Sequence, residues 1–97
     1  MKFIQLSNSK CPPCKVLRDY MTNKIIKGVE YTYYSYDKPE DNINVDEVWV
    51  ADVMKAAGSA GLRSLPIVGV IKKGKVVNVS TVRTEADIKK VLKYKYK

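Results

Sequence analysis

Two cysteines are the residues of this chain whose type and spacing best allow chemistry. Cys11 and Cys14 are its only cysteines, and two residues separate them. At this spacing a pair can cycle between a dithiol and a disulfide, with one thiolate attacking a substrate and the other releasing it. A CxxC pair can also form half of a zinc or iron–sulfur site. The chain has no histidine and no further cysteine to complete such a site, so two copies would have to share the metal.

The residues around the pair favour a reactive thiolate at Cys11. An apolar segment precedes it and a helical pattern follows, and Pro12 suits the first turn of a helix, where its missing N–H is not needed. Cys11 is therefore expected at or near the N-cap, where free N–H groups and the helix dipole stabilise an anion. Lys10 and Lys15 add positive charge. We expect Cys11 to be the nucleophile and Cys14, one turn later, to resolve the mixed disulfide.

The elements that must position the cysteines alternate between strands and helices. Runs of β-formers predict strands at residues 2–7, 29–36, 66–71 and 76–80. Apolar residues at helical spacing predict two helices, the first marked by Val16, Leu17, Tyr20, Met21 and Ile25 and the second by Val45, Val48, Trp49, Val53, Ala56 and Ala57.

Capping signals set the predicted starts of the second and third helices. Asn44 with Glu47, and Thr84 with Asp87, resemble capping boxes, while Gly58 and Gly61 would end the second helix.

The predicted order is strand, helix, strand, helix, strand, strand, helix. A strand–helix–strand start implies a right-handed crossover and a parallel pair, and the closing hairpin adds antiparallel strands. We therefore expect an α/β fold with a mixed four-stranded sheet, flanked on both faces by three helices, in one domain of residues 1–97.

The composition is that of a soluble globular protein, with 45% hydrophobic and 29% charged residues. The apolar stretch at the N-terminus is too short for a signal peptide, and no segment is long enough to span a membrane. We therefore expect a cytoplasmic monomer. The net charge of +8 is interpreted as a solvated basic surface rather than a nucleic-acid site.

Two motifs resemble those of the thioredoxin and glutaredoxin superfamily. Residues 3–16, a strand followed by CPPCK and a helix, are similar to the thioredoxin active-site segment, usually WCGPCK. Residues 61–66, GLRSLP, are similar to the thioredoxin run GIRGIP, and the hairpin at 70–77 resembles the strands that follow it. The resemblance implies a thioredoxin-like fold in which Pro66 is cis and packs against the active-site disulfide. It also implies that the Leu65 backbone pairs with an extended substrate.

The resemblance further implies a dithiol–disulfide oxidoreductase whose only redox group is its own disulfide, with no bound cofactor. Its catalytic residues would be Cys11 and Cys14, and its substrate-binding residues Lys10, Pro12, Pro13, Leu65 and Pro66. The small phage and bacterial glutaredoxin-like thioredoxins that it resembles reduce protein disulfides, for example in ribonucleotide reductase. Thioredoxin reductase or glutathione would supply the electrons.

Several residues depart from the family pattern. Gln5 stands where thioredoxins carry a buried aspartate, Tyr33 where they carry a lysine, and Lys10 where they carry a tryptophan. A carboxylate that would accept the Cys14 proton is thus missing from its usual place, which leaves water to serve. The paired glycines of glutaredoxins are absent from residues 79–84.

These features favour a general protein-disulfide reductase recharged by thioredoxin reductase. A glutathione-dependent glutaredoxin is the main alternative, and a basic nucleic-acid-binding module and a metal-bridged dimer are less favoured.

Overall fold

The chain folds in the predicted order of strands and helices. The structure is a computed structural model and describes residues 1–23 and 26–93. Its elements are β1 (Lys2–Ser7), α1 (Pro12–Asn23), β2 (Glu30–Ser35), the short 3₁₀ helix η1 (Pro39–Asp41), α2 (Glu47–Ser59), β3 (Ile67–Lys72), β4 (Lys75–Thr81) and α3 (Glu85–Leu92). The bounds differ from the predicted ones by a residue or two, and Ile25 lies outside the described residues.

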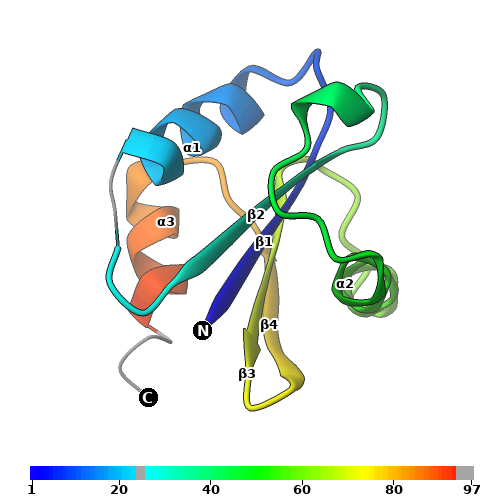
Figure 1. The fold of residues 1–97 in the computed structure, drawn as a ribbon, viewed down its shortest axis with the longest axis vertical. Helices are drawn as coiled ribbons and strands as arrows, with labels where there is room; N and C mark the ends of the chain where they lie inside the picture. The colour runs from blue at the N-terminus through cyan, green and yellow to red at the C-terminus, as the bar shows by residue number, and fades with distance from the viewer. Residues whose placement is uncertain (24–25, 94–97) are drawn as a thin grey trace.

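The sheet is mixed, as predicted, with its strands in the order β2-β1-β3-β4. β1 and β2 are parallel, while β3 is antiparallel to both β1 and β4. The helices α1 and α3 lie on one face of the sheet and α2 on the other (Figure 1). This α/β architecture is consistent with a thioredoxin-like fold.

Alternating side chains of the strands divide the core into two layers. Residues on the side of α1 and α3 are Phe3, Leu17, Met21, Val68, Val70, Val82, Ile88 and Val91. Residues on the side of α2 are Ile4, Leu6, Val50, Val53, Ala57, Ile67 and Ile71. Because successive side chains of a strand point to opposite faces, β1 and β3 each contribute to both layers.

Helix α2 approaches the sheet most closely at Gly69 of β3. A Cβ atom on Gly69 would lie 2.7 Å from Cγ1 of the fully buried Val53, well inside van der Waals contact. Glycine is therefore required here by the close approach of a neighbouring side chain rather than by its backbone conformation.

Only one of the two predicted capping boxes is present. Thr84 and Asp87 form the predicted box at the start of α3. The predicted Asn44–Glu47 box is wrong, because Asp46 is the N-cap and its carboxylate accepts a hydrogen bond from Val48 N at 3.0 Å. Asn44 has a φ of 50°, a left-handed conformation that asparagine tolerates and that an N-cap does not adopt.

The predictions for the first and second helices are partly wrong. Gly58 lies inside α2 and does not end it, whereas Gly61, with a φ of 72°, directly follows the C-cap residue Ala60 as predicted. Val16 and Val48, expected on inward faces, are 66% and 67% exposed. Their helices turn other residues to the core, among them Leu17 and Val53.

The chain after β2 turns back along the outer edge of the sheet. Ile43 pairs with Tyr33 in an isolated antiparallel bridge, with N–H to oxygen distances of 2.9 and 3.1 Å. This short return segment leads into α2.

Candidate functional site

The cysteine pair lies between β1 and the first turn of α1. Cys11 and Cys14 form a disulfide, and their Cα atoms are 5.2 Å apart. Because α1 begins at Pro12, Cys11 directly precedes the helix, as predicted. The Cys11 carbonyl accepts hydrogen bonds from Cys14 N and Lys15 N, at 3.1 and 3.3 Å. The Cys14 N–H also lies 3.3 Å from the Cys11 sulfur and points at it, so it can stabilise negative charge there after reduction.

The two sulfurs differ in their access to solvent. Cys14 is fully buried, whereas Cys11 is partly exposed. Lys10 and Pro12 beside it are exposed, and Pro13 is half-buried. A substrate can therefore reach Cys11 but not Cys14, which favours Cys11 as the attacking group.

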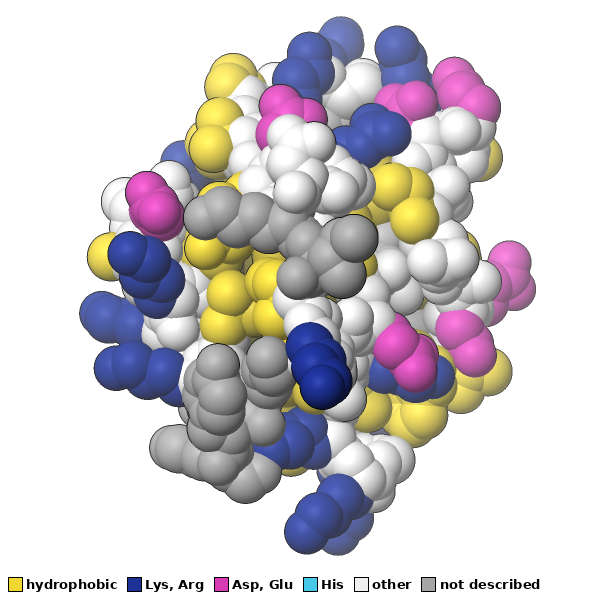
Figure 2. Space-filling view, turned by 60° about the vertical axis from the view of Figure 1, so that its left-hand side comes forward, with side chains coloured by type: hydrophobic (Ala, Val, Ile, Leu, Met, Phe, Trp, Pro, Cys, Tyr) yellow, Lys and Arg dark blue, Asp and Glu magenta, His cyan; other side chains and the backbone are white. Residues whose placement is uncertain are grey.

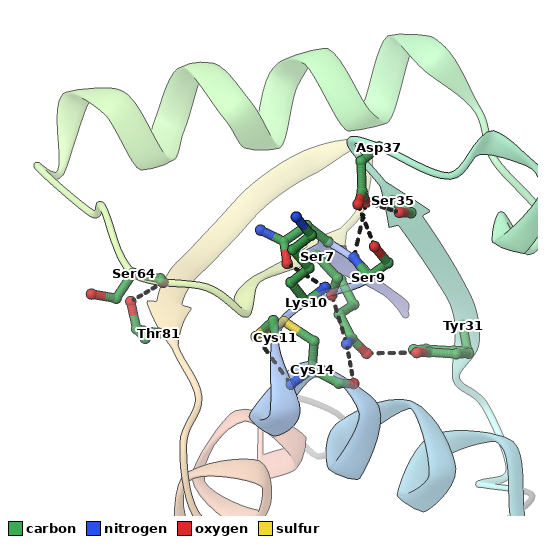
Figure 3. Close-up of a disulfide and its surroundings, with 12 residues drawn as sticks. Ser7, Ser9, Lys10, Cys11, Cys14, Tyr31, Ser35, Asp37, Ser64 and Thr81 are labelled. Carbon is green, nitrogen blue, oxygen red and sulfur yellow. Dashed lines mark hydrogen bonds between the residues drawn. A yellow bond between two sulfur atoms is a disulfide. The ribbon is translucent and has the colours of Figure 1, made fainter.

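A buried polar network contacts the main chain of Cys14 (Figure 3). The side-chain amide of Gln5 donates to the Cys14 carbonyl at 2.9 Å and to Ser7 Oγ at 2.8 Å. Its own carbonyl oxygen accepts from the Tyr31 hydroxyl at 2.5 Å. Gln5 thus joins β1 to the first turn of α1 and to β2 through one side chain.

A second, exposed cluster holds the loop just before Cys11. The Asp37 carboxylate accepts hydrogen bonds from Ser9 N at 2.9 Å, from the Ser9 hydroxyl, and from Ser35 Oγ at 2.9 Å. These bonds, chiefly those from Ser9, lower the pKa of Asp37 to about 2. The cluster ties the loop that carries Lys10 to the end of β2 (Figure 3).

The predicted cis-proline segment lies at the same end of the sheet. The Leu65–Pro66 peptide is cis, as the resemblance implied, and Pro66 is fully buried. Ile67, the next residue, pairs with Leu6 near the end of β1, so the topology brings this segment to the end where the cysteines lie. Two hydrogen bonds of 3.2 Å, from Val82 N to the Pro66 carbonyl and from the Thr81 hydroxyl to the Ser64 carbonyl, hold it to the end of β4. Packing of Pro66 on the disulfide and pairing of Leu65 with a substrate stay predictions.

A small pocket of about 180 Å³ opens beside Pro13. Its walls come from α1, from the connection after β4 and from α3, namely Pro13, Val16, Leu17, Tyr20, Val82, Arg83, Thr84, Glu85 and Ile88. An apolar cavity of about 150 Å³ takes a benzene ring, so this pocket is of a size for one large apolar side chain.

The charged side chains do not form a second candidate site in the described part of the chain. In Figure 2, Lys and Arg side chains are scattered around the visible face with acidic groups between them, and the described residues form no single basic stripe there. Across residues 1–23 and 26–93, no three or more Cys, Asp or Glu side chains cluster in a way that could hold a metal ion. The helices in the same two ranges are too short or too polar to cross a membrane.

Three residues of the site escaped prediction as site residues: Gln5, Tyr31 and Asp37. The sequence shows Gln5 only as a departure from the family pattern, and it places Tyr31 in a predicted strand without a functional role. One signal was present, since Gln5 and Ser7 are polar residues that alternate with the apolar Ile4 and Leu6 in a predicted strand. The partners of Gln5 required the three-dimensional arrangement.

No protein-family model matches the sequence, and a search of curated proteins found no match. The interpretation of the site therefore rests on its own geometry. That geometry is a CxxC pair, joined as a disulfide at the start of a helix, in an α/β fold compatible with the thioredoxin type.

Proposed function

We propose that the protein is a dithiol–disulfide oxidoreductase that reduces disulfides in protein substrates. The observation that carries the proposal is the asymmetric pair at the start of α1, with Cys11 partly exposed and Cys14 fully buried. A nucleophile must meet its substrate, whereas a resolving thiol needs only to reach its partner. The exposed Lys10 and Pro12, with the half-buried Pro13 and the backbone of Leu65 beside the buried Pro66, would form the surface on which the substrate lies.

The reaction takes place in two exchanges at sulfur. The Cys11 thiolate attacks one sulfur of the substrate disulfide, so that the other substrate sulfur leaves as a thiolate and a mixed disulfide forms. Cys14 loses its proton to water and attacks the Cys11 sulfur, which breaks the bond to the substrate and closes the Cys11–Cys14 disulfide. The substrate has gained two electrons and the protein has lost them. A separate reductant must then restore the dithiol.

Hydrogen bonds at the start of α3 help to choose between glutathione and thioredoxin reductase as the electron donor. The Asp87 carboxylate accepts from Arg83 N at 3.1 Å and from Thr84 N at 3.2 Å. Amide groups of this kind would otherwise suit the carboxylate of a small anionic thiol such as glutathione. Since the protein's own side chain occupies both of them, the arrangement favours thioredoxin reductase over glutathione as the electron donor.

Insulin reduction with each electron source tests the proposal. We expect turnover with thioredoxin reductase and NADPH to exceed turnover with glutathione and glutathione reductase. Activity only with glutathione would contradict thioredoxin reductase as the electron donor, but it would still be consistent with the dithiol–disulfide exchange at Cys11 and Cys14.

Single cysteine variants test the chemistry itself. Cys11→Ser is expected to abolish turnover, and Cys14→Ser to accumulate a mixed disulfide with the substrate that mass measurement of the intact protein detects. Full reductase activity in Cys11→Ser would sink the proposal.

A further inference from the structure

The side chain of Gln5 occupies an unusual place for an amide, since it is completely buried on an inner strand of the sheet, against the main chain of Cys14. Its two donated hydrogen bonds go to the Cys14 carbonyl and Ser7 Oγ, and its oxygen accepts from Tyr31. No buried side-chain nitrogen or oxygen within the described part of the chain lacks a partner. A buried amide is stable only while such bonds are made, so the bonds of Gln5 strongly fix its position.

The contact with the Cys14 carbonyl has a direct geometric consequence. It anchors the first turn of α1 to β1, the strand that leads into Cys11. The Cys14 sulfur is attached to the same residue whose main chain is held. Its distance and direction to the Cys11 sulfur therefore depend on this anchor when the disulfide is open.

We propose that Gln5 and Tyr31 are positioning residues for the resolving step: they hold Cys14 where its sulfur can attack Cys11, without placing a charge beside it. The inference rests on the proposed function and adds a role for two residues that do not touch the substrate. Gln5 makes the contact with Cys14, and Tyr31 orients Gln5.

The network of Gln5, Ser7 and Tyr31 carries no charge, and burial of the Tyr31 hydroxyl favours its protonated form. Burial, followed by the neighbouring Tyr33, raises the pKa of Tyr31, so its hydroxyl remains a donor at physiological pH. The charged groups that act on Tyr31 are Arg18 and Asp19 of α1, with opposite effects on its pKa. The guanidinium of Arg18 lies 4.8 Å from the centre of the Tyr33 ring. The pH dependence of the resolving step should therefore be that of the thiol alone.

Rapid mixing with a symmetric nitrobenzoate disulfide separates the two steps, because each step releases one coloured thiolate. In the first phase, Cys11 attacks the reagent and one thiolate leaves. In the second phase, Cys14 attacks the Cys11 sulfur, the second thiolate leaves and a proton passes to solvent. The reduced full-length protein is used throughout, so both rates come from the same trace.

Two variants remove the network in different degrees. Gln5→Leu is expected to slow the second phase by about ten-fold while the first stays within about two-fold of wild type. Tyr31→Phe removes only the hydroxyl and is the variant less prone to unfold, with the second phase expected to slow by about three-fold. A purely structural role would instead lower stability and slow both phases together.

A third variant, Gln5→Glu, keeps the shape and adds a charge. The carboxylate loses both donated hydrogen bonds and opposes ionisation of the Cys14 thiol. We expect the ratio of the wild-type to the Gln5→Glu second-phase rate to be largest near about pH 6 and to fall as pH increases to about 9, because a raised thiol pKa slows the step most where the thiol is mainly protonated. A ratio independent of pH would contradict the role of neutrality.

The matched control is Tyr34→Phe, which removes a hydroxyl from the same strand on the side of α2. Both of its phases are expected to match wild type. The inference is overturned if Gln5→Leu and Tyr31→Phe leave the second phase unchanged or slow both phases equally. Loss of the first phase in Cys11→Ser is a separate test, so failure of this inference and failure of the proposed function are distinguishable.

Discussion

The two faces of the sheet differ in the side chains that they bury. The face under α2 is lined by apolar side chains and comes so close to the helix that only glycine fits at Gly69. The face under α1 and α3 begins in the same way at Phe3 but turns polar at Gln5 and Ser7, where Gln5 bonds the Cys14 carbonyl. The first face is built for packing, whereas the second exchanges apolar packing for directed hydrogen bonds at the end where chemistry is proposed. Substitutions should therefore separate stability from reactivity.

The largest effect on stability is expected on the α2 face. Gly69→Ala forces a methyl group into Val53 and should lower the free energy of unfolding by about 3 kcal/mol, measured by urea denaturation. The matched control is Gly58→Ala, inside α2 with open space around its Cα, which should raise it by about 0.5–1 kcal/mol. Neither change should alter the rates of thiol exchange in the folded protein. Equal effects on stability would contradict the close packing.

A smaller loss of stability, now coupled to reactivity, is expected on the other face. Ser7→Ala leaves one N–H of the buried Gln5 amide without an acceptor and should lower the free energy of unfolding by about 1–2 kcal/mol. It should also slow release of the second thiolate. Ser59→Ala, at the exposed end of α2, serves as the control. If Ser7→Ala changed stability alone, Ser7 would belong to the packing of the sheet and not to the positioning network.

The exposed cluster before Cys11 should make the stability of the fold depend on pH, through the Asp37 carboxylate. Hydrogen bonds from Ser9 and Ser35 lower the pKa of Asp37 from 3.8 to about 2 in the folded protein. A carboxylate with a lowered pKa stabilises the fold above its unfolded pKa, and this contribution is lost as pH falls through the folded value. Urea midpoints should thus be lower for Asp37→Asn than for wild type at neutral pH, and should converge below about pH 2.

The control for this comparison is Asp52→Asn, which alters an exposed carboxylate on α2. Its urea midpoint should stay close to wild type at both pH values. A difference between Asp37→Asn and wild type that persisted unchanged at low pH would assign the effect to something other than the charge of Asp37.

The smallest effect on stability is expected for two valines that are almost equally exposed. Val16→Glu, beside the pocket next to Pro13, and Val48→Glu, on α2, should each change the free energy of unfolding by less than about 0.5 kcal/mol. Only Val16→Glu should raise the KM for protein disulfides, by about five-fold if an apolar contact of about 1 kcal/mol is lost. Equal KM values for both variants would show that protein substrates do not contact this pocket.

The order of elements and the cysteine pair were predictable because the signals for them are local. Periodicity places the helices and strands, and Pro12 after Cys11 marks a helix start. The start of α2 was misplaced because Asn44 and Asp46 are both good capping residues, and the choice depends on the backbone conformation of Asn44. The cis Leu65–Pro66 peptide was predicted from the resemblance and not from the composition of the segment.

The buried network could not be predicted, because its members come together only through the register of the sheet. Gln5 and Tyr31 are 26 residues apart, and their hydrogen bond depends on the parallel pairing of β1 with β2. A pattern of alternating polarity identifies the face on which Gln5 lies, but not the carbonyl that it holds. The exposure of Val16 likewise depends on which residues of α1 the sheet and α3 cover.

The bridge between Ile43 and Tyr33 has a consequence for self-association. An outer strand with free N–H and carbonyl groups is a template for pairing with a strand from another molecule. On β2 the N–H and carbonyl groups of Tyr33 are hydrogen-bonded to Ile43 of the returning chain, and the Asn42 side chain accepts a hydrogen bond from Ser35 N at 2.8 Å. At the opposite edge, β4 carries one extra residue, Val77, opposite Val70 and Ile71, which makes this strand irregular. Both outer strands are thus poor templates for aggregation, and the protein can expose a reactive sulfur without also exposing a regular strand edge.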